Sequence, residues 1–202
     1  AYVHIPFCHR RCFYCDFAVI PLGNKVETLQ GYGSKTVKEY LHFLYKEILS
    51  IKHKSSLSTI YVGGGTPSIL DPQQIKQLID LFKENYGVDY GAEITMEVDP
   101  ASFNLDDLHG FINAGINRFS LGVQSFNNQI LQKSGRRHLR EDAEKSCLWL
   151  KKVYSAGLIK SWSLDLIQNL PLSGLREWKE DLKKAITSVS YTHLRAHETR
   201  EY

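Results

Sequence analysis

Three cysteines stand close together near the start of the chain and could bind a soft metal centre. Cys8, Cys12 and Cys15 have the spacing C-x3-C-x2-C and follow a short apolar run, residues 2–7, typical of a strand that ends near Pro6. Thiolates packed this closely suit iron and other soft metals. A [4Fe–4S] cluster normally takes four cysteine ligands, so three would leave one iron open to a substrate or cofactor.

Two other uses of these thiols are alternatives. A structural zinc site usually takes four ligands, and the fourth would have to be His4, His9 or the distant Cys147. A disulfide framework is disfavoured because only four cysteines serve a chain of 202 residues. The cluster is therefore the preferred interpretation, and a non-catalytic zinc-binding module stays open beside it.

A glycine-rich turn is the second stretch that could bind a ligand. Gly63-Gly64-Gly65-Thr66-Pro67 follows the apolar strand residues 59–62 and precedes a helix. Glycines let the backbone approach a ligand closely and present free N–H groups. No Gly-Lys-Ser/Thr follows, so the turn is not a phosphate-binding P-loop. A plain tight turn between strand and helix is the structural alternative.

Strand and helix patterns alternate along the rest of the chain. Strands are predicted at 59–62, 93–98, 116–123 and 161–167, and 18–35 is predicted to be a loop. Helices are predicted at 36–52, 105–114, 127–133, 141–155 and 175–186, and a further helix begins at Pro72 and ends before Gly87 or Gly91. Asp71 before Pro72, and Asn104, are good helix N-terminal residues, and Gly115 is a good helix end. Repeated βα units predict parallel strands joined by right-handed crossovers.

The polar residues that close the strands favour a barrel over an open doubly wound sheet. Cys8, Gly63 to Thr66, Glu97, Gln124 and Asp165 each stand at the end of a strand pattern. In a (β/α) barrel those ends converge on one mouth, where active sites lie. No G-x-G-x-x-G follows the first strand, so the dinucleotide-binding fingerprint is absent.

The cysteine spacing, with Tyr14 before the third cysteine, resembles the radical S-adenosylmethionine (SAM) superfamily. Tyr-Val-His-Ile-Pro-Phe-Cys and Cys-Phe-Tyr-Cys-Asp-Phe are similar to words of its oxygen-independent coproporphyrinogen III oxidase group and, within it, the haem chaperone (HemW) branch. The resemblance implies a [4Fe–4S] cluster held by Cys8, Cys12 and Cys15, bound SAM, and haem as a further ligand. It implies a partial parallel (β/α)6 barrel, incomplete at the C-terminus, over residues 1–189.

The resemblance also implies which residues contact SAM. These are Tyr2, Tyr14, Gly64, Gly65, Thr66, Glu97, Gln124, Arg136, Asp165 and Ile167. Taken alone, Glu97 would be a solvated acid at a strand end and Arg136 a surface charge. In the family, one-electron reduction cleaves SAM to methionine and a 5′-deoxyadenosyl radical, and the protein supplies position and exclusion of water. No catalytic residue beyond the cluster site is implied.

One departure from the family pattern decides between its branches. The oxidases carry another cysteine two residues after the third ligand, where this chain has Phe17, which cannot replace a thiol. The word Cys-Asp-Phe is that of the haem chaperone branch, so the resemblance implies a role in haem delivery and porphyrin metabolism. Oxidative decarboxylation of coproporphyrinogen III is the alternative activity. The implied partners are a reducing electron donor and haem-accepting proteins.

Composition argues against nucleic-acid binding and a membrane span, and the two ends of the sequence allow predictions about the termini. The formal charge of +3 is mild, and no basic tract of the nucleic-acid-binding kind or apolar run of membrane-spanning length occurs. Ala1 begins inside a strand pattern, so we expect the natural N-terminus to be missing. Residues 190–202 are polar and aperiodic and look like an irregular, non-native tail on a truncated frame. The words after the third cysteine resemble plant-type relatives, which favours an organelle, mitochondrion or plastid, over the cytoplasm.

Overall fold

A six-stranded parallel sheet organises the molecule. The computed structural model describes residues 1–23, 32–51, 55–188 and 194–198. The sheet runs in the order β1 (Tyr2–Ile5), β4 (Leu57–Gly64), β5 (Val88–Val98), β6 (Arg118–Gln124), β7 (Ser161–Gln168) and β8 (Leu194–Glu198), and every neighbouring pair is parallel. β1 and β8 are the two edges, so the sheet is an open, partial barrel, as the sequence predicts.

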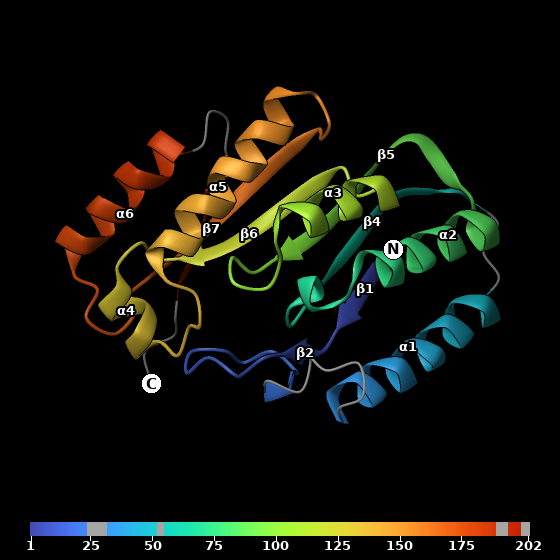
Figure 1. Ribbon diagram of the computed structural model, residues 1–202, viewed down its shortest axis with the longest axis horizontal. Helices are drawn as coiled ribbons and strands as arrows, with labels where there is room; N and C mark the ends of the chain where they lie inside the picture. The colour runs from blue at the N-terminus through green and yellow to red at the C-terminus, as the bar shows by residue number, and fades with distance from the viewer. Residues whose placement is uncertain (24–31, 52–54, 189–193, 199–202) are drawn as a thin grey trace.

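Helices connect successive strands and lie over one face of the sheet, with α1 and α6 at opposite ends (Figure 1). They are α1 (Tyr32–Ser50), α2 (Pro72–Tyr86), α3 (Leu105–Ala114), α4 (Asn128–Lys133), α5 (Arg140–Ser155) and α6 (Leu175–Ser188), with a short 3-10 helix, η2 (Pro67–Ile69). The predicted helix starts are confirmed, since Asp71 and Asn104 both form capping boxes. Gly115 ends α3 in the left-handed region, at φ 111°.

The two faces of the sheet differ in polarity. The side chains that point toward the helices are apolar and buried, among them Val62, Met96, Phe119, Leu121, Val123, Leu164 and Leu166. Their neighbours in sequence point the other way, and Ser120, Gly122 and Asp165 line a cavity there. This alternation with a period of two places the hydrophobic core between sheet and helices and leaves the concave face polar.

Three segments differ from the predictions. β5 begins at Val88 instead of residue 93. The predicted loop 18–35 contains β3 (Ile20–Pro21), which pairs in parallel with β2 (Phe7–Cys8). The helix predicted at 36–52 begins earlier, at Tyr32 within that loop, and ends at Ser50. Residues 194–198 were predicted to be irregular, and this is wrong: they form β8, which satisfies the backbone groups that β7 would otherwise expose at a sheet edge. The remainder of the predicted tail, 190–193 and 199–202, lies outside the described residues.

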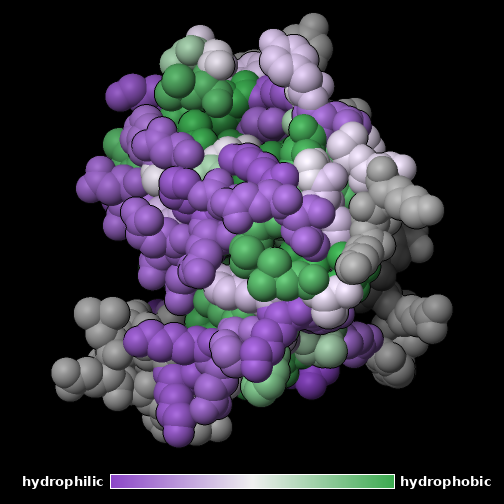
Figure 2. Space-filling model, turned by 90° about the vertical axis from the view of Figure 1, so that its right-hand side faces the viewer, coloured by the Kyte–Doolittle hydropathy of each residue, from purple (hydrophilic) through white to green (hydrophobic). Residues whose placement is uncertain are grey.

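The face of the molecule drawn in Figure 2 is mainly polar. Figure 2 shows a face on which hydrophilic residues surround separate apolar patches. Among the described residues, no helix has both the length and the apolar character needed to cross a lipid bilayer.

Candidate metal and cofactor site

The loop that carries the three cysteines is held at both ends by the pairing of β2 with β3. We call residues 8–19 the cysteine loop. The N–H of Ile20 donates to Pro6 O at 2.6 Å, and the N–H of Leu22 donates to Cys8 O at 2.8 Å. These bonds join β3 to β2 and bring the two ends of the loop together. Because the ends are fixed, the loop between them has fewer conformations to lose when its thiols take up a metal.

The cysteine loop also rests on the turn between α4 and α5. The N–H of Phe13 donates to Ser134 O at 3.1 Å, and Nε of Arg10 donates to Gly135 O at 2.7 Å. Gly135 has φ +79°, and a Cβ there would lie 3.4 Å from the Cα of Cys12. Sequence reasoning missed Arg10, whose partner lies 125 residues away along the chain.

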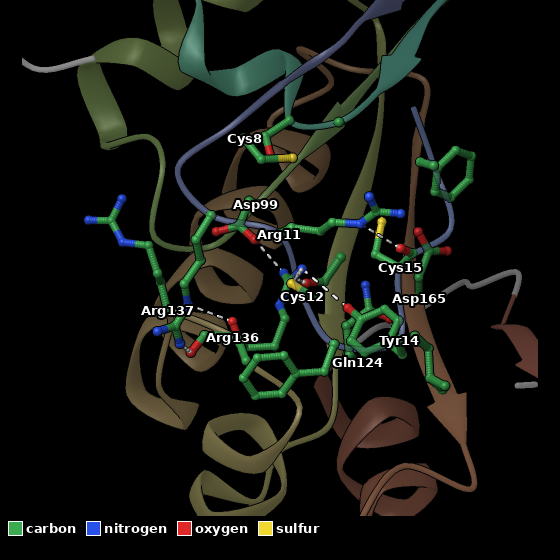
Figure 3. A pocket seen from close by; sticks show the side chains of 18 of the residues that line it. Cys8, Arg11, Cys12, Tyr14, Cys15, Asp99, Gln124, Arg136, Arg137 and Asp165 are labelled. Atoms are coloured by element: carbon green, nitrogen blue, oxygen red, sulfur yellow. Dashed lines mark hydrogen bonds and ion pairs between the residues drawn. The ribbon is translucent and has the colours of Figure 1, made fainter. Parts of the chain in front are cut away.

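One cavity of about 720 Å³ collects the predicted site (Figure 3). Its lining includes all three cysteines of the loop together with Tyr14, Gly64, Gly65, Thr66, Glu97, Gln124, Arg136, Asp165 and Ile167. Tyr2 is not in the lining. Its ring stacks on Tyr61 with centroids 6.0 Å apart, and its hydroxyl lies 3.0 Å from Nδ1 of His4.

On one wall of the cavity, the glycine-rich turn that ends at Thr66 lies against Cys8. The N–H of Thr66 donates to Phe7 O at 2.8 Å, and its hydroxyl donates to Cys8 Sγ at 3.5 Å. A Cβ on Gly65 would lie 2.6 Å from Phe7 O and 2.9 Å from Cys8 Sγ. Glycine is therefore required at this position by the close approach of the two segments.

Glu97 forms a hydrogen bond with the backbone of the same glycine-rich turn. Its Oε2 accepts from the N–H of Gly64 at 3.1 Å, and its Oε1 accepts from the hydroxyl of Tyr61 at 2.7 Å. Gly64 itself has φ +115°, a region that residues with a Cβ rarely adopt. A carboxylate at the predicted position is thus tied to the glycine-rich turn and lies in the cavity wall.

Burial keeps the Cys8 thiol protonated in the metal-free chain. Desolvation is the main reason that the pKa of Cys8 rises to about 11, with the Thr66 hydroxyl acting in the opposite direction and the neighbouring thiols adding to the rise. Metal binding to this site would therefore release a proton from Cys8.

On the other wall, Arg136 carries the network that lies against Cys12. Its Nη2 forms an ion pair with Asp99 and donates to Gly122 O at 2.7 Å. Its Nη1 lies 3.4 Å from the Tyr14 hydroxyl and 3.9 Å from Cys12 Sγ. The side chain is only 12% exposed, so Arg136 is not the surface charge that its sequence context alone would suggest.

Charge pairing outweighs burial at both members of this ion pair. Burial alone would raise the pKa of Asp99, but Arg136 and then His138 lower it below its usual value. Burial likewise acts to lower the pKa of Arg136, and Asp99 raises it. Sequence reasoning missed Asp99 and His138, which follow a strand and a glycine turn without any motif of their own.

Tyr14 anchors the cysteine loop by its ring as well as by its hydroxyl. The ring packs against a small apolar cluster of Ile130, Ile167 and Leu170, which lies apart from the main core. Burial raises the pKa of Tyr14, while Arg136 acts to lower it. Ile167 therefore both lines the cavity and supports the loop residue that precedes Cys15.

Gln124 has a strained backbone and an unsatisfied side-chain atom. It stands at φ +68°, where the pairing of β6 with β7 shifts register between Gly122 and Gln124. Its Oε1 is buried and has no hydrogen-bond partner among the described residues. Strain of this kind collects at ligand sites, and a buried acceptor in a cavity wall calls for a donor from a bound molecule.

The donor set has the chemistry of an iron–sulfur site, because three thiols of one loop line the same cavity. Within the described part of the chain, no three His, Cys, Asp or Glu side chains converge as they would around one metal ion. Figure 3 shows the three thiols of the loop, all of which line the shared cavity. In a cluster the three thiolates bind different irons, so they need to line one space and need not converge on a single point.

A sequence profile of the radical SAM superfamily matches residues 2–166. The chain belongs to this superfamily. The superfamily carries a [4Fe–4S] cluster and SAM, and the match spans the cysteine loop, the glycine-rich turn and the first residues of the polar wall on β7. The zinc-module alternative gains no support from it.

The individual relatives point to one group of this superfamily. The chain is 39% identical over 189 residues to "Heme chaperone HemW" of Synechocystis, which covers 93% of this chain and 44% of the relative. It is 34% identical over 206 residues to "Oxygen-independent coproporphyrinogen III oxidase" of Salmonella typhimurium, covering 96% of this chain and 42% of the relative. The solved oxidase HemN from Escherichia coli superposes with a TM-score of 0.85 at 29% identity, over 100% of this chain and 44% of HemN. The chain thus spans less than half the length of these relatives.

Proposed function

We propose that Cys8, Cys12 and Cys15 bind a [4Fe–4S] cluster and that SAM binds beside it in the same cavity. The observation that carries this proposal is the common lining: residues from the cysteine loop, the glycine-rich turn and the ends of β5, β6 and β7 meet around one space. A radical SAM fold without such a meeting point could not place a cofactor next to the cluster.

The residues of the two walls have different tasks in this proposal. The turn at Gly64 and Gly65 admits the backbone close to the ligand, while Glu97 and Asp165 offer carboxylates to its amine and hydroxyl groups. Gln124 offers its free amide oxygen to a hydrogen-bond donor of SAM. Arg136 offers its positive charge to the carboxylate of SAM. The cluster, when bound and reduced, supplies the electron that cleaves SAM, and the protein orients the ligand and excludes water.

The function that the site and the relatives favour is that of a haem chaperone of the HemW kind. Phe17 stands where the oxidases have an additional cysteine, and it lines the cavity. Relatives named as haem chaperones reach 39% identity. Haem would be a further ligand, a reducing protein the electron donor, and haem-accepting proteins the partners. A location in a mitochondrion or plastid stays a prediction, since the relatives reported above come from bacteria.

Coproporphyrinogen III oxidation is the second candidate function. The TM-score of 0.85 with HemN and the 34% identity to the Salmonella oxidase favour it. Both functions would use the same cluster and SAM site. They differ in the substrate, and the oxidases have a cysteine where this chain has Phe17.

Anaerobic reconstitution with iron and sulfide tests the shared part of the proposal. The chain should take up about four irons per molecule, and its electron paramagnetic resonance spectrum should change when SAM is added, because SAM binds an open iron. A protein that holds one zinc and no sulfide would refute the cluster. Mass spectrometry after incubation with coproporphyrinogen III then separates the two functions, because vinyl products would establish the oxidase. Haem binding by a protein that forms no vinyl products would support the chaperone.

A further inference from the structure

Arg136 is held along one edge by three fixed acceptors. Its Nη2 reaches the Asp99 carboxylate and Gly122 O, and its Nε donates to Nδ1 of His138 at 3.3 Å. A guanidinium has five N–H donors in a rigid plane, so fixing Nε and Nη2 also fixes Nη1. Nη1 is the group that faces Cys12 Sγ and the Tyr14 hydroxyl.

His138 can accept from Arg136 only in one tautomer, and its other ring nitrogen selects that tautomer. Nε2 lies 3.0 Å from Val123 O, and a carbonyl oxygen can only accept. The proton is therefore on Nε2, and Nδ1 keeps the lone pair that accepts from Nε–H of Arg136. The imidazole is buried, with an exposed fraction of 1%. Besides Nε of Arg136, its Nδ1 faces Oδ2 of Asp99 at 3.9 Å, which is beyond hydrogen-bond distance.

Asp99 is oriented in a similar way. Its Oδ1 accepts from the N–H of Ala101 at 3.1 Å, which leaves Oδ2 for Arg136. Its own N–H donates to the hydroxyl of the buried Ser68 at 3.0 Å. Neither Asp99 nor His138 reaches the cysteine sulfurs by a hydrogen bond among the described contacts. His138 lies behind the cavity lining and reaches the site through Arg136, whereas Asp99 stands in the lining beside Arg136.

We propose that Asp99 and His138 are positioning residues that hold the Arg136 guanidinium so that Nη1 is presented to the Cys12 sulfur and to the cavity. The inference rests on the proposed cluster and SAM site and adds two residues to it. Hydrogen bonds to cysteine sulfur raise the reduction potential of iron–sulfur clusters, and a fixed cation strengthens binding of a carboxylate ligand. Displacing Arg136 should therefore weaken SAM binding and make the potential more negative.

Nitrogen-15 NMR of the metal-free chain tests the positioning without the cluster. The proposal requires His138 to be neutral at pH 7 with its proton on Nε2. A proton on Nδ1, or on both nitrogens, would overturn it. This measurement needs neither iron nor SAM. It therefore still tests the positioning of Arg136 even if the wild-type chain proves not to bind a cluster.

Three variants test the effect on the site. Asp99→Asn removes the charge, His138→Phe removes the acceptor, and His138→Asn restores an acceptor near Nδ1; His109→Phe, at an exposed position on α3, is the control. After reconstitution to equal iron and sulfide, Asp99→Asn and His138→Phe should bind SAM about tenfold more weakly and have a more negative midpoint potential. His138→Asn should recover most of both losses, and His109→Phe should match the wild type.

Wild-type affinity and potential in fully loaded Asp99→Asn and His138→Phe proteins would overturn the proposal. So would equal losses in His138→Phe and His138→Asn, because a merely structural role would not distinguish an acceptor from its absence. If His138→Phe does not fold, Asp99→Asn and the tautomer measurement decide. A wild-type protein that loads no cluster refutes the proposed function instead.

Discussion

On one wall of the cavity Cys8 lies against the glycine-rich turn, and on the other wall Cys12 lies beside a largely buried cation, Arg136. The first contact depends on the absence of a side chain, since a Cβ on Gly65 would lie 2.9 Å from Cys8 Sγ. The second depends on charge and hydrogen bonds, since Arg136 is balanced by Asp99 and reaches Cys12 through Nη1. One wall is thus sensitive to volume and the other to charge.

Removing a thiol from either wall should have the largest effect. We expect Cys8→Ala and Cys12→Ala to abolish the cluster, since two thiolates cannot hold it stably, and to abolish SAM binding with it. Iron and acid-labile sulfide are measured after anaerobic reconstitution. Cys147→Ala is the matched control, because Cys147 is buried in α5 away from the cavity lining. A Cys12→Ala protein that keeps its full brown colour and SAM uptake would show that the site has been misplaced.

Breaking the charged wall should cost more stability than filling the glycine wall. Asp99→Ala leaves Arg136 buried without its counter-ion, which should reduce the free energy of unfolding of the metal-free chain by about 3–5 kcal/mol. Asp80→Ala removes the surface partner of Lys76 and Lys83 and should cost about 1 kcal/mol or less. Urea unfolding measures both. Equal losses in the two variants would contradict a buried charge network at the cavity.

Gly65→Ala tests the wall that depends on volume. The added methyl group would overlap Phe7 O and Cys8 Sγ, so the cost should be about 1–3 kcal/mol and cluster uptake should fall. Gly174→Ala is the control, because its nearest neighbour is the end of the flexible Glu177 side chain. Urea unfolding and iron content are compared. If both variants behave alike, the close approach at Gly65 does not hold the site.

The pH dependence of stability should be the smallest effect, and it should have opposite signs for two carboxylates, Asp99 and Asp181. The pKa of Asp99 is lowered by Arg136 in spite of burial, so its contribution to stability is present above about pH 4 and is lost as the pH falls. Burial raises the pKa of Asp181, although Ser125 and Phe126 donate hydrogen bonds to it. Its contribution is therefore present below about pH 4 and is lost as the pH rises through the folded-state pKa.

Urea unfolding of Asp99→Asn and Asp181→Asn between about pH 3 and pH 7 measures this difference. The advantage of the wild type over Asp99→Asn should grow as the pH rises. Its advantage over Asp181→Asn should shrink over the same range. Slopes of the same sign would mean that Arg136 does not set the charge of Asp99.

Much of the fold could be predicted because it depends on local patterns. The alternation of strands and helices, the caps at Asp71 and Asn104, and the end of β5 at Val98 follow from hydrophobic period and turn residues. The predicted metal and SAM residues also meet in one cavity, with Tyr2 outside its lining. β3 and β8 were missed because short strands pair through backbone groups, which leave little trace in the side-chain pattern.

The sequence by itself determined the chemistry: three thiols at cluster spacing, a glycine-rich turn after a strand, and Phe17 in place of a fourth loop cysteine. Only the tertiary structure decided how the walls of the cavity are held. Arg136 meets Cys12 across 124 residues of sequence, and the tautomer of His138 depends on a carbonyl of another segment. Such contacts depend on how distant strands are placed in the sheet and on the direction of single side chains, and no local spacing encodes either.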